Sequence, residues 1–287
     1  MDQNIELHLV IAWNAAVQAS KLIRRVVEEG FEVQYKEDES PVTHADKQAS
    51  RLIESMLKST NIPVLSEEAD TESYEKRKSY EWLWIVDPLD GTREFVRGGY
   101  DYTVNIALIH DEKPVLGVIV SPYHEHGWWG VERIGAFKAG AEADILSFAS
   151  LKEKSISIEP SKEIKPSLRV TGTRSHVNQA TFCCYEQIKK IDSQASFMSI
   201  GSSLKFCQIA AGEADVYIRA SAIYEWDTAA GDAIVRAAGG CVLDLYKHQP
   251  LIYNKQSLKQ PPFLVVSMPL YEHLQTLWPL LVSCLNK

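Results

Sequence analysis

The chain has 287 residues and a mass of 32.3 kDa, and 45% of its residues are hydrophobic, which is enough to bury a sizeable core. Its formal net charge of −8 at pH 7 argues against a general nucleic-acid binder, because such proteins need clustered lysine and arginine. No apolar run is long enough to cross a membrane, so we expect no membrane span. A small phosphorylated ligand remains compatible with this composition, since local positive charge or a bound metal can override the net sign.

The first half of the chain predicts two helices followed by a run of strands. Residues 5–29 have helical periodicity and stop at Gly30, and a second helix is expected from about Asp46 to Lys58. Acidic residues precede the basic cluster of the first helix, which favours an amphipathic helix over a signal peptide. Short apolar segments joined by turn-like connectors then predict strands over 62–65, 82–86, 103–109 and 114–120. This run of strands favours a largely antiparallel sheet.

The second half of the chain follows a different pattern. Residues 141–167 are polar and less periodic, so we place a domain boundary near residue 155, between an N-terminal domain of 1–155 and a C-terminal domain of 156–287. Beyond it, strands and helices alternate, which favours an α/β layer. The expected strands cover 168–172, 196–201, 215–219, 241–245 and 263–267. The expected helices cover 176–190, 202–211, 227–238 and 269–285.

The cysteines bear on the cellular compartment. Their number is odd and none forms a C-x-x-C pair, which predicts a reducing cytoplasm and no disulfide framework. Two of them are adjacent on an expected helix and are interpreted as core or surface thiols. The five are Cys183, Cys184, Cys207, Cys241 and Cys284.

Four acidic stretches stand out, and each has an ordinary structural explanation when it is taken alone. Asp46 in SPVTHAD can close a capping box at a helix start. Asp227 in YEWDTAAGDA can cap the next helix, and the Glu67–Glu68 pair can be a solvated loop. The DPLDG of WIVDPLDGTREF, with Asp87 and Asp90, can be a simple turn.

Taken together, the acidic residues predict a metal site. Glu67 and Asp87 each follow an expected strand, so both can lie at the same end of a sheet. The D-P-L-D-G-T turn holds Asp87 close to Asp90, and two such charges repel unless something positive lies between them. Carboxylate oxygens suit Mg²⁺, and no histidine or cysteine lies within the cluster, which argues against zinc. We therefore expect a magnesium ion between the acids.

The same stretches resemble the signatures of the inositol monophosphatase superfamily. SPVTHAD, LSEE, WIVDPLDGTREF and EWDTAAGDAIVRAAGG are similar to its T-x-A-D, [GS]-E-E, D-P-[IL]-D-G-T and W-D-x-A-A-G elements, in that order. SIGSSLKFCQIAAGEADVY and the TRSH of residues 173–176 resemble segments of its bacterial 3′(2′),5′-bisphosphate nucleotidase branch. TGTRSH and RASAIYEWD depart from the forms typical of that branch, which leaves the identity of the substrate open.

This resemblance implies roles for the acidic residues and their neighbours. Two or three Mg²⁺ ions are expected on Glu67, Asp87, Asp90, Asp227 and the backbone carbonyl of Leu89. Thr92, hydrogen-bonded to Asp46, is expected to orient the attacking water and accept its proton, with Glu67 as a further catalytic residue. A helix that begins at Gly91 and Thr92 is expected to present its N–H groups to the phosphate, and Gly91 lets the backbone approach closely.

A second phosphate on the substrate needs its own anchor. Gly201, Ser202, Ser203 and Lys205 follow an expected strand and open a helix, which is typical of an anion site. The alternative is a plain serine cap with a surface lysine. The other candidate substrate-binding residues are Gly91, Thr92, Arg174, Arg219 and Asp227.

The resemblance also implies a fold and a function. The expected fold is a mixed α/β, five-layered α-β-α-β-α sandwich. The expected activity is Mg²⁺-dependent removal of the 3′-phosphate from 3′-phosphoadenosine 5′-phosphate in sulfate assimilation, inhibited by Li⁺ and lost when Ca²⁺ replaces Mg²⁺. Inositol monophosphatase and fructose-1,6-bisphosphatase are alternatives of the same class, and a non-catalytic protein that binds a metal or a nucleotide is the alternative from another class. The expected partner is a small phosphorylated molecule, with a homodimer as a possible assembly.

Three other features have structural interpretations. His124 and His126 are expected in a surface turn rather than at a metal. The adjacent Trp128 and Trp129 are expected to pack in the core. Asp232, which follows the second signature on its helix, is expected to be solvated.

Overall fold

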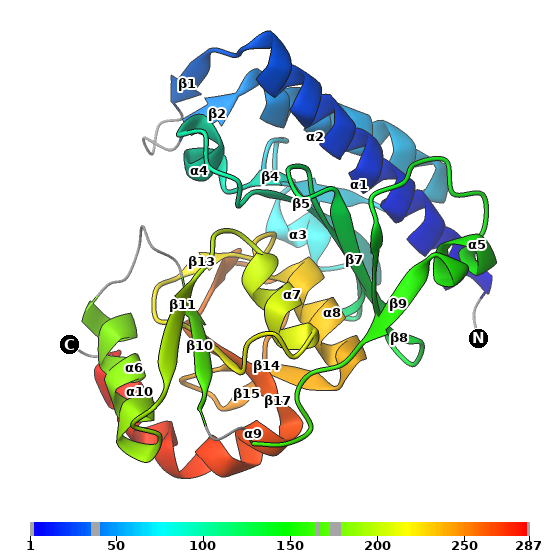
Figure 1. Ribbon diagram of the computed structural model, residues 1–287. Helices are drawn as coiled ribbons and strands as arrows, with labels where there is room; N and C mark the ends of the chain where they lie inside the picture. Colours follow the sequence, from blue (N-terminus) through cyan, green and yellow to red (C-terminus); the bar gives the residue numbers. More distant parts are fainter. Residues whose placement is uncertain (1–2, 36–40, 165–166, 173–178, 286–287) are drawn as a thin grey trace.

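The computed structural model describes residues 3–35, 41–164, 167–172 and 179–285, and its elements stack in layers (Figure 1). The helices of these layers are α1 (Gln3–Glu29), α2 (His44–Leu57), α6 (Gln179–Ile191), α7 (Leu204–Ala210), α8 (Ala229–Ala238), α9 (Met268–Leu274) and α10 (Trp278–Cys284). Helices α1 and α2 cover a seven-stranded sheet, and α7 and α8 separate that sheet from a six-stranded one. Helices α6, α9 and α10 cover the far side of the six-stranded sheet. The predicted α-β-α-β-α sandwich is therefore confirmed.

The seven-stranded sheet is largely antiparallel, as the sequence predicts. Its strands pair in chain order, with a parallel first pair and antiparallel pairs throughout the rest. They are β3 (Val64–Ser66), β4 (Trp82–Asp90), β5 (Thr103–His110), β6 (Lys113–Ser121), β7 (His126–Val131), β8 (Gly135–Gly140) and β9 (Ser155–Ile158).

The last three strands of this sheet were not predicted from the sequence. Trp128 and Trp129 lie in β7 and are buried, as expected of packing residues. The glycines and alanines of β7 and β8 weaken the alternation of apolar and polar residues that marks a strand. Strand β9 pairs with β8, so the first sheet runs slightly past residue 155, and the next strand begins at Arg169. A division of the chain into two domains near 155 stays a prediction.

The six-stranded sheet is mixed. Its order is β11-β10-β12-β17-β14-β15, with β10 parallel to both of its neighbours and the remaining pairs antiparallel. These strands are β10 (Arg169–Gly172), β11 (Ser196–Ser199), β12 (Val216–Arg219), β14 (Gly240–Asp244), β15 (Gln249–Pro250) and β17 (Phe263–Ser267). The shorter elements are β1 (Val33–Tyr35), β2 (Pro41–Thr43), α3 (Tyr74–Arg77), α4 (Thr92–Val96), α5 (Phe148–Glu153), β13 (Ile223–Tyr224) and β16 (Lys259–Gln260), with 3-10 turns at Lys58–Thr60 and Gln275–Leu277.

Helix α1 packs on the seven-stranded sheet through a continuous apolar face. Leu9, Trp13, Ala16 and Ile23 recur at helical spacing and are fully buried. The helix ends where the sequence predicts, before Gly30, whose φ of +79° suits glycine at the end of a helix. No helix of the described residues is long and apolar enough to cross a membrane.

Helix α8 lies very close to the seven-stranded sheet. A Cβ atom on Gly117 of β6 would come within 2.3 Å of the Ala230 carbonyl oxygen, and one on Gly130 of β7 within 2.7 Å of the Ile234 Cα. Both positions therefore require glycine, because any side chain would push α8 away from the sheet. This contact matters for the site, since Asp227 lies directly before α8.

The C-terminal helix predicted over 269–285 is broken in the structure. Helix α9 ends at Leu274, a 3-10 turn covers Gln275–Leu277, and α10 starts at Trp278. Pro279 stands in the first turn of α10. A proline has no N–H to donate and clashes with the carbonyl one turn earlier, so one continuous helix is not possible here.

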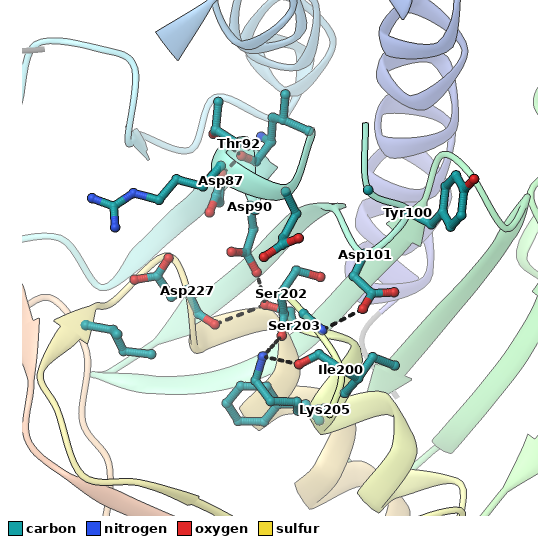
Figure 2. A pocket seen from close by; sticks show the side chains of 18 of the residues that line it. Asp87, Asp90, Thr92, Tyr100, Asp101, Ile200, Ser202, Ser203, Lys205 and Asp227 are labelled. Carbon is teal, nitrogen blue, oxygen red and sulfur yellow. Dashed lines mark hydrogen bonds between the residues drawn. The ribbon is translucent and has the colours of Figure 1, made fainter. Parts of the chain in front are cut away.

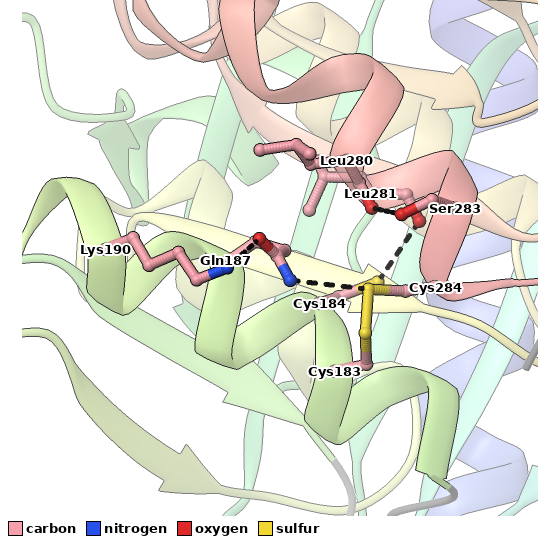
Figure 3. Close-up of a disulfide and its surroundings, with 8 residues drawn as sticks. All are labelled: Cys183, Cys184, Gln187, Lys190, Leu280, Leu281, Ser283 and Cys284. Carbon is pink, nitrogen blue, oxygen red and sulfur yellow. Dashed lines mark hydrogen bonds between the residues drawn. A yellow bond between two sulfur atoms is a disulfide. The ribbon is translucent and has the colours of Figure 1, made fainter.

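Two cysteines form a disulfide, so the prediction that no cysteine pairs is wrong for them. Cys183 of α6 is bonded to Cys284 of α10, with a Cα–Cα distance of 5.6 Å (Figure 3). Their sequence separation of 101 residues hides the pairing, because connectivity follows from the fold rather than from spacing. Cys184, Cys207 and Cys241 are free. The bond ties two outer helices of the six-stranded sheet together.

Candidate active site

A cluster of carboxylates lies where β3 and β4 end. Ser66 pairs with Val86 in the parallel pair of these strands, so Glu67, just beyond β3, and Asp87, within β4, lie at the same edge of the sheet. The strand expected to end at residue 86 continues to Asp90, because Asp87 and Asp90 still pair with β5 across a register shift instead of forming a simple turn. Carboxylate oxygens of Asp87, Asp90 and Asp227 all lie within 4.8 Å of one another (Figure 2). The first and second signatures, far apart in sequence, therefore meet at one point.

Asp87 is a buried carboxylate that lies close to other negative charges. Its side chain is 1% exposed, Oδ1 accepts from the Leu89 N–H at 3.0 Å, and Oδ2 is buried without a hydrogen-bond partner. Burial, followed by the charges of Glu67, Asp90 and Asp227, raises the pKa of Asp87 well above its ordinary value. The pKa of Asp227 is also raised well above its ordinary value, by burial and then by Asp90 and Glu67.

These residues fit a divalent cation of the Mg²⁺ type. A buried carboxylate oxygen without a donor is costly, and a bound cation satisfies it. The donors that converge are hard oxygens, and the half-buried Glu67 lines the same cavity. Three of the expected ligands, Asp87, Asp90 and Asp227, thus converge, while Glu67 and Leu89 line the same cavity.

Asp46 and Thr92 form the expected pair. Thr92 Oγ1 donates to Asp46 Oδ1 at 3.0 Å, and the second acceptor within its reach is the Leu89 carbonyl oxygen, also at 3.0 Å. The other oxygen, Asp46 Oδ2, accepts from the Thr43 N–H at 2.7 Å and from its hydroxyl at 2.6 Å, which closes the capping box of α2. The capping box expected of Asp46 is confirmed, and the expected hydrogen bond from Thr92 uses the other carboxylate oxygen, so the two contacts are compatible. Burial raises the pKa of Asp46.

Gly91 allows the turn after the carboxylates. Its φ is +93°, and a Cβ atom there would lie 2.8 Å from the Asp101 carbonyl oxygen and 3.4 Å from the Ser202 Cβ. The backbone thus comes close to the Gly201–Lys205 segment, and a larger residue would separate the two. Helix α4 begins at Thr92, as expected, and is only five residues long.

The Gly201–Lys205 segment lines the cavity and does not have the plain serine cap and surface lysine that were the alternative to an anion site. The Gly201 N–H donates to Asp101 Oδ2 at 2.8 Å, and the Lys205 ammonium donates to the Ser202 carbonyl (Figure 2). Lys205 is 3% exposed, so it is not a surface lysine, and Ser203 makes no side-chain cap at the start of α7. Burial lowers the pKa of Lys205 to about 8, against the opposing effect of Asp90, Asp101 and Asp227.

Two further polar side chains line the cavity, and each has a buried atom without a hydrogen-bond partner. Arg219 lines the cavity as expected, and its Nε is buried without a hydrogen-bond partner. Ser199, which the sequence analysis missed, lines the same cavity with a buried hydroxyl that has no partner. It lies within the strand expected over 196–201, two residues before Gly201, and this closeness to the expected anion site is the signal that could have identified it. Arg174 lies outside the described residues.

One cavity contains these groups. Its volume is about 670 Å³, within the range that holds a nucleotide-sized ligand. The carboxylates line it together with the Gly201–Lys205 segment and with Arg219. It therefore offers an acidic region for cations and basic groups for an anion within one space.

Two further expectations have an outcome in the structure. His124 is exposed in the turn after β6, as expected, with Nε2 3.9 Å from Asp101 Oδ1, whereas His126 is exposed but begins strand β7 and does not lie in the turn. The expectation of a solvated Asp232 is wrong, because this residue is fully buried and ion-paired with Arg236 at 2.6 Å. The Tyr253 hydroxyl also donates to Asp232 at 2.8 Å, so the buried charge is compensated by two partners.

Comparison with known proteins identifies relatives along almost the whole chain. The sequence profile of the inositol monophosphatase family matches residues 5–275. The chain is 37% identical over 238 residues to the 3′(2′),5′-bisphosphate nucleotidase CysQ of Escherichia coli strain K12, covering 82% of this chain and 89% of that protein. It is 39% identical over 233 residues to the protein of the same name from Salmonella typhimurium strain LT2, covering 80% of this chain and 87% of that protein.

Solved structures agree with this likeness. The crystal structure of CysQ from Bacteroides thetaiotaomicron, described as a bacterial member of the inositol monophosphatase family, matches with a TM-score of 0.84 at 38% identity, covering 91% of this chain and 97% of that one. An IMPase/NADP phosphatase complexed with Mg²⁺ and phosphate matches with a TM-score of 0.70 at 19% identity, covering 92% of this chain and 90% of that one. This second likeness shows a shared fold alone.

Proposed function

The chain belongs to the inositol monophosphatase family, and from this premise we propose that it is a Mg²⁺-dependent phosphatase that converts 3′-phosphoadenosine 5′-phosphate to AMP and phosphate. Relatives that are 37% and 39% identical over most of their length are named 3′(2′),5′-bisphosphate nucleotidases. The observation that carries the proposal is the unpartnered Asp87 oxygen within the carboxylate cluster, beside the Thr92–Asp46 pair.

The carboxylate cluster is assigned to the metal ions. Glu67, Asp87, Asp90, Asp227 and the carbonyl of Leu89 would hold two or three Mg²⁺. When bound, the ions supply Lewis-acid stabilisation to the oxygens that gain charge as a phosphate ester is hydrolysed. The protein residues hold these ligands in place through β4 and through the start of α8.

We assign the transfer of the proton from the attacking water to Thr92 and Asp46. Thr92 has one hydroxyl hydrogen, and when it points to Asp46 the oxygen of Thr92 is free to accept a hydrogen from the attacking water. Thr92 can then pass its own hydrogen to Asp46 Oδ1, 3.0 Å away. The two bonds from Thr43 hold the carboxylate in position, and the raised pKa of Asp46 makes it a better proton acceptor.

A substrate with two phosphate groups fits the rest of the cavity. Lys205 and Arg219 line it together with the carboxylate cluster, so one phosphate can meet cations while another meets basic side chains. An inositol monophosphate would leave the buried Arg219 Nε unpartnered. A protein that only binds a metal or nucleotide would not need the Thr92–Asp46 pair. Gly91, Gly201, Ser202 and Arg174 remain part of the proposed substrate site.

The proposal extends to assembly and compartment. A homodimer is one alternative to a monomer, and sedimentation at several protein concentrations distinguishes the two. We expect a cytoplasmic location. Disulfides are rare in that compartment, so the Cys183–Cys284 bond provides a test. The test counts the free thiols of the protein after its cysteines have been alkylated inside the cells. Five titratable thiols in freshly trapped protein would agree with that location and show that the Cys183–Cys284 bond forms only after extraction, whereas three would show that the bond exists in the cell and would contradict that location.

Phosphate release from three substrates tests the proposed function. The substrates are 3′-phosphoadenosine 5′-phosphate, inositol 1-phosphate and fructose 1,6-bisphosphate, each with Mg²⁺, with and without LiCl, and with NaCl as the control. We expect the highest kcat/KM for the nucleotide and inhibition by Li⁺ alone. Preference for inositol 1-phosphate would keep the reaction and overturn the substrate. Turnover of none of the three would overturn the activity and favour a protein that only binds.

A further inference from the structure

Ser203 lies at the junction of the two halves of the carboxylate cluster. Its hydroxyl donates to Asp90 Oδ2 at 2.7 Å and lies 3.1 Å from the Asp227 backbone carbonyl oxygen (Figure 2). Asp90 comes from the end of β4 and Asp227 from the turn before α8. One buried hydroxyl, 2% exposed, thus contacts residues on both sides of the site.

The hydrogen-bonding capacity of Ser203 is largely used within the protein. Asn105 Nδ2 donates to Ser203 Oγ at 2.9 Å and also lies 3.4 Å from Asp90 Oδ2. A serine hydroxyl has a single hydrogen to donate, and here both acceptors for it belong to Asp90 and Asp227. A phosphate oxygen needs a donor, so Ser203 can serve a phosphate only by releasing Asp90.

We infer that Ser203, supported by Asn105, is a positioning residue for Asp90 and Asp227 and not the phosphate anchor that its sequence context indicates. The inference rests on the proposed function for what the cluster binds. Donors that fix the orientation of ligating side chains contribute to metal affinity without touching the metal. The chain Asn105–Ser203–Asp90 fixes one ligand, and the Asp227 carbonyl ties the second ligand to the same point.

The neighbouring Ser202 provides a matched contrast. Its hydroxyl is within 3.3 Å of Thr103 Oγ1, it lines the cavity, and it is half-buried. The two serines are adjacent and chemically identical, so the same truncation can be compared at both. A positioning role predicts a change in metal affinity at Ser203, while a substrate role predicts a change in KM at Ser202.

The experiment measures metal binding and kinetics in parallel. Mn²⁺ serves as the probe, because oxygen sites of this kind accept it and free Mn²⁺ gives an EPR signal. We expect Ser203→Ala to raise the Mn²⁺ dissociation constant and the Mg²⁺ concentration for half-maximal rate by about 10- to 100-fold. KM for the nucleotide at saturating Mg²⁺ stays unchanged. Ser202→Ala should show the reverse, and Ser203→Thr, which keeps the hydroxyl, should restore Mn²⁺ binding.

Asn105→Ala provides a second route to the same conclusion. It leaves the Ser203 hydroxyl in place but removes its support, so a smaller rise in the Mn²⁺ dissociation constant is expected. The double variant should bind Mn²⁺ less weakly than the sum of the two single effects predicts, because Asn105 acts mainly through Ser203 at 2.9 Å and only through a longer direct contact of 3.4 Å to Asp90. Melting temperatures from circular dichroism identify any variant that fails to fold. If Ser203→Ala does not fold, the Mn²⁺ dissociation constants of Asn105→Ala and Ser203→Thr test the positioning role instead.

The outcomes separate this inference from the proposed function. If the wild type hydrolyses the nucleotide while Ser203→Ala binds Mn²⁺ normally and has a raised KM, the positioning role is wrong and the function stands. If the wild type hydrolyses no nucleotide but Ser203→Ala still binds Mn²⁺ weakly, the function is wrong and the positioning role stands.

Discussion

Two stretches line the same cavity, Asp87–Thr92 and Gly201–Lys205, and the contacts of the first were easier to predict from the sequence than those of the second. In the first, the side chains expected to act together are together, and one buried carboxylate oxygen has no protein partner. In the second, the Gly201 N–H and the Lys205 ammonium contact other protein groups. Clustered carboxylates repel one another, so they indicate a cation site directly from the sequence. Hydroxyls, amides and amines find protein acceptors, so their role depends on the fold.

Replacing Asp90 should have the largest effect and breaks the first stretch directly. Asp90→Asn removes a charge from the cluster, and we expect kcat to fall about 1000-fold or more, because metal ions contribute several kcal/mol of stabilisation. Mn²⁺ binding should weaken with it, as measured by EPR. Asp111→Asn is the matched control, since Asp111 is exposed in the turn after β5 and asparagine tolerates its φ of +46°. Normal hydrolysis by Asp90→Asn would show that the metal assignment is wrong.

Replacing Thr92 separates proton transfer from metal binding within the first stretch. Thr92→Val removes the hydroxyl that donates to Asp46, and we expect kcat to fall about 100-fold, the usual scale of acid–base catalysis. The Mn²⁺ dissociation constant should stay unchanged, since Thr92 is not among the expected ligands. Thr92→Ser, which keeps a hydroxyl, is the control and should retain most of the rate. A large loss of Mn²⁺ affinity in Thr92→Val would contradict this separation.

The pH dependence of KM tests whether Lys205, in the second stretch, binds the substrate. Burial lowers its pKa to about 8, so its positive charge disappears as the pH rises through that value. We expect KM for the nucleotide to rise above about pH 8, and Lys205→Met to raise KM about 10-fold at pH 7, the value of a hydrogen bond to a charged group. The variant should lose the pH dependence of KM. A KM profile that is the same in both proteins would show that Lys205 does not serve the substrate.

The disulfide should have the smallest effect on activity, because it lies on the outer helices. Cys183→Ser should lower the free energy of unfolding by about 2–4 kcal/mol, since the bond closes a long loop of the unfolded chain. Urea denaturation with and without reductant measures this, with kcat and KM expected to be unchanged. Cys241→Ser is the control, because Cys241 is a free cysteine and its variant should respond to reductant as the wild type does. Loss of activity in Cys183→Ser would contradict the expectation that a bond between outer helices does not affect the active site.

The fold was predictable where local signals decide the outcome. The stop at Gly30 and the capping box at Asp46 follow from backbone preferences that a few neighbouring residues express. Helix α9 ends early because of Pro279, a local signal that the sequence analysis overlooked. The disulfide joins residues 101 apart, and no short pattern expresses that contact.

The charged cluster of the site was predictable, and so was the Thr92–Asp46 hydrogen bond that the family resemblance implies, but the hydrogen bonds of Ser203 were not. Asp87 and Asp90 belong to one turn, so their proximity is fixed by three residues of chain. Ser203 bonds to Asp90 across 113 positions, and its donor Asn105 is 98 positions away. Asp232 has the same dependence on the fold, because its burial follows from the packing of α8. The hydrogen-bond partner of a polar side chain thus depends on which layers of the fold come together, and no short stretch of sequence determines that packing.

Phosphorus NMR of 3′-phosphoadenosine 5′-phosphate incubated with the protein and Mg²⁺ tests the central claim most directly. It reports which phosphate leaves, and a parallel sample with EDTA reports whether a metal is required. The account predicts AMP and inorganic phosphate with Mg²⁺, and no change with EDTA. Release of the 5′-phosphate, equal conversion in EDTA, or an unchanged nucleotide in both samples would contradict it.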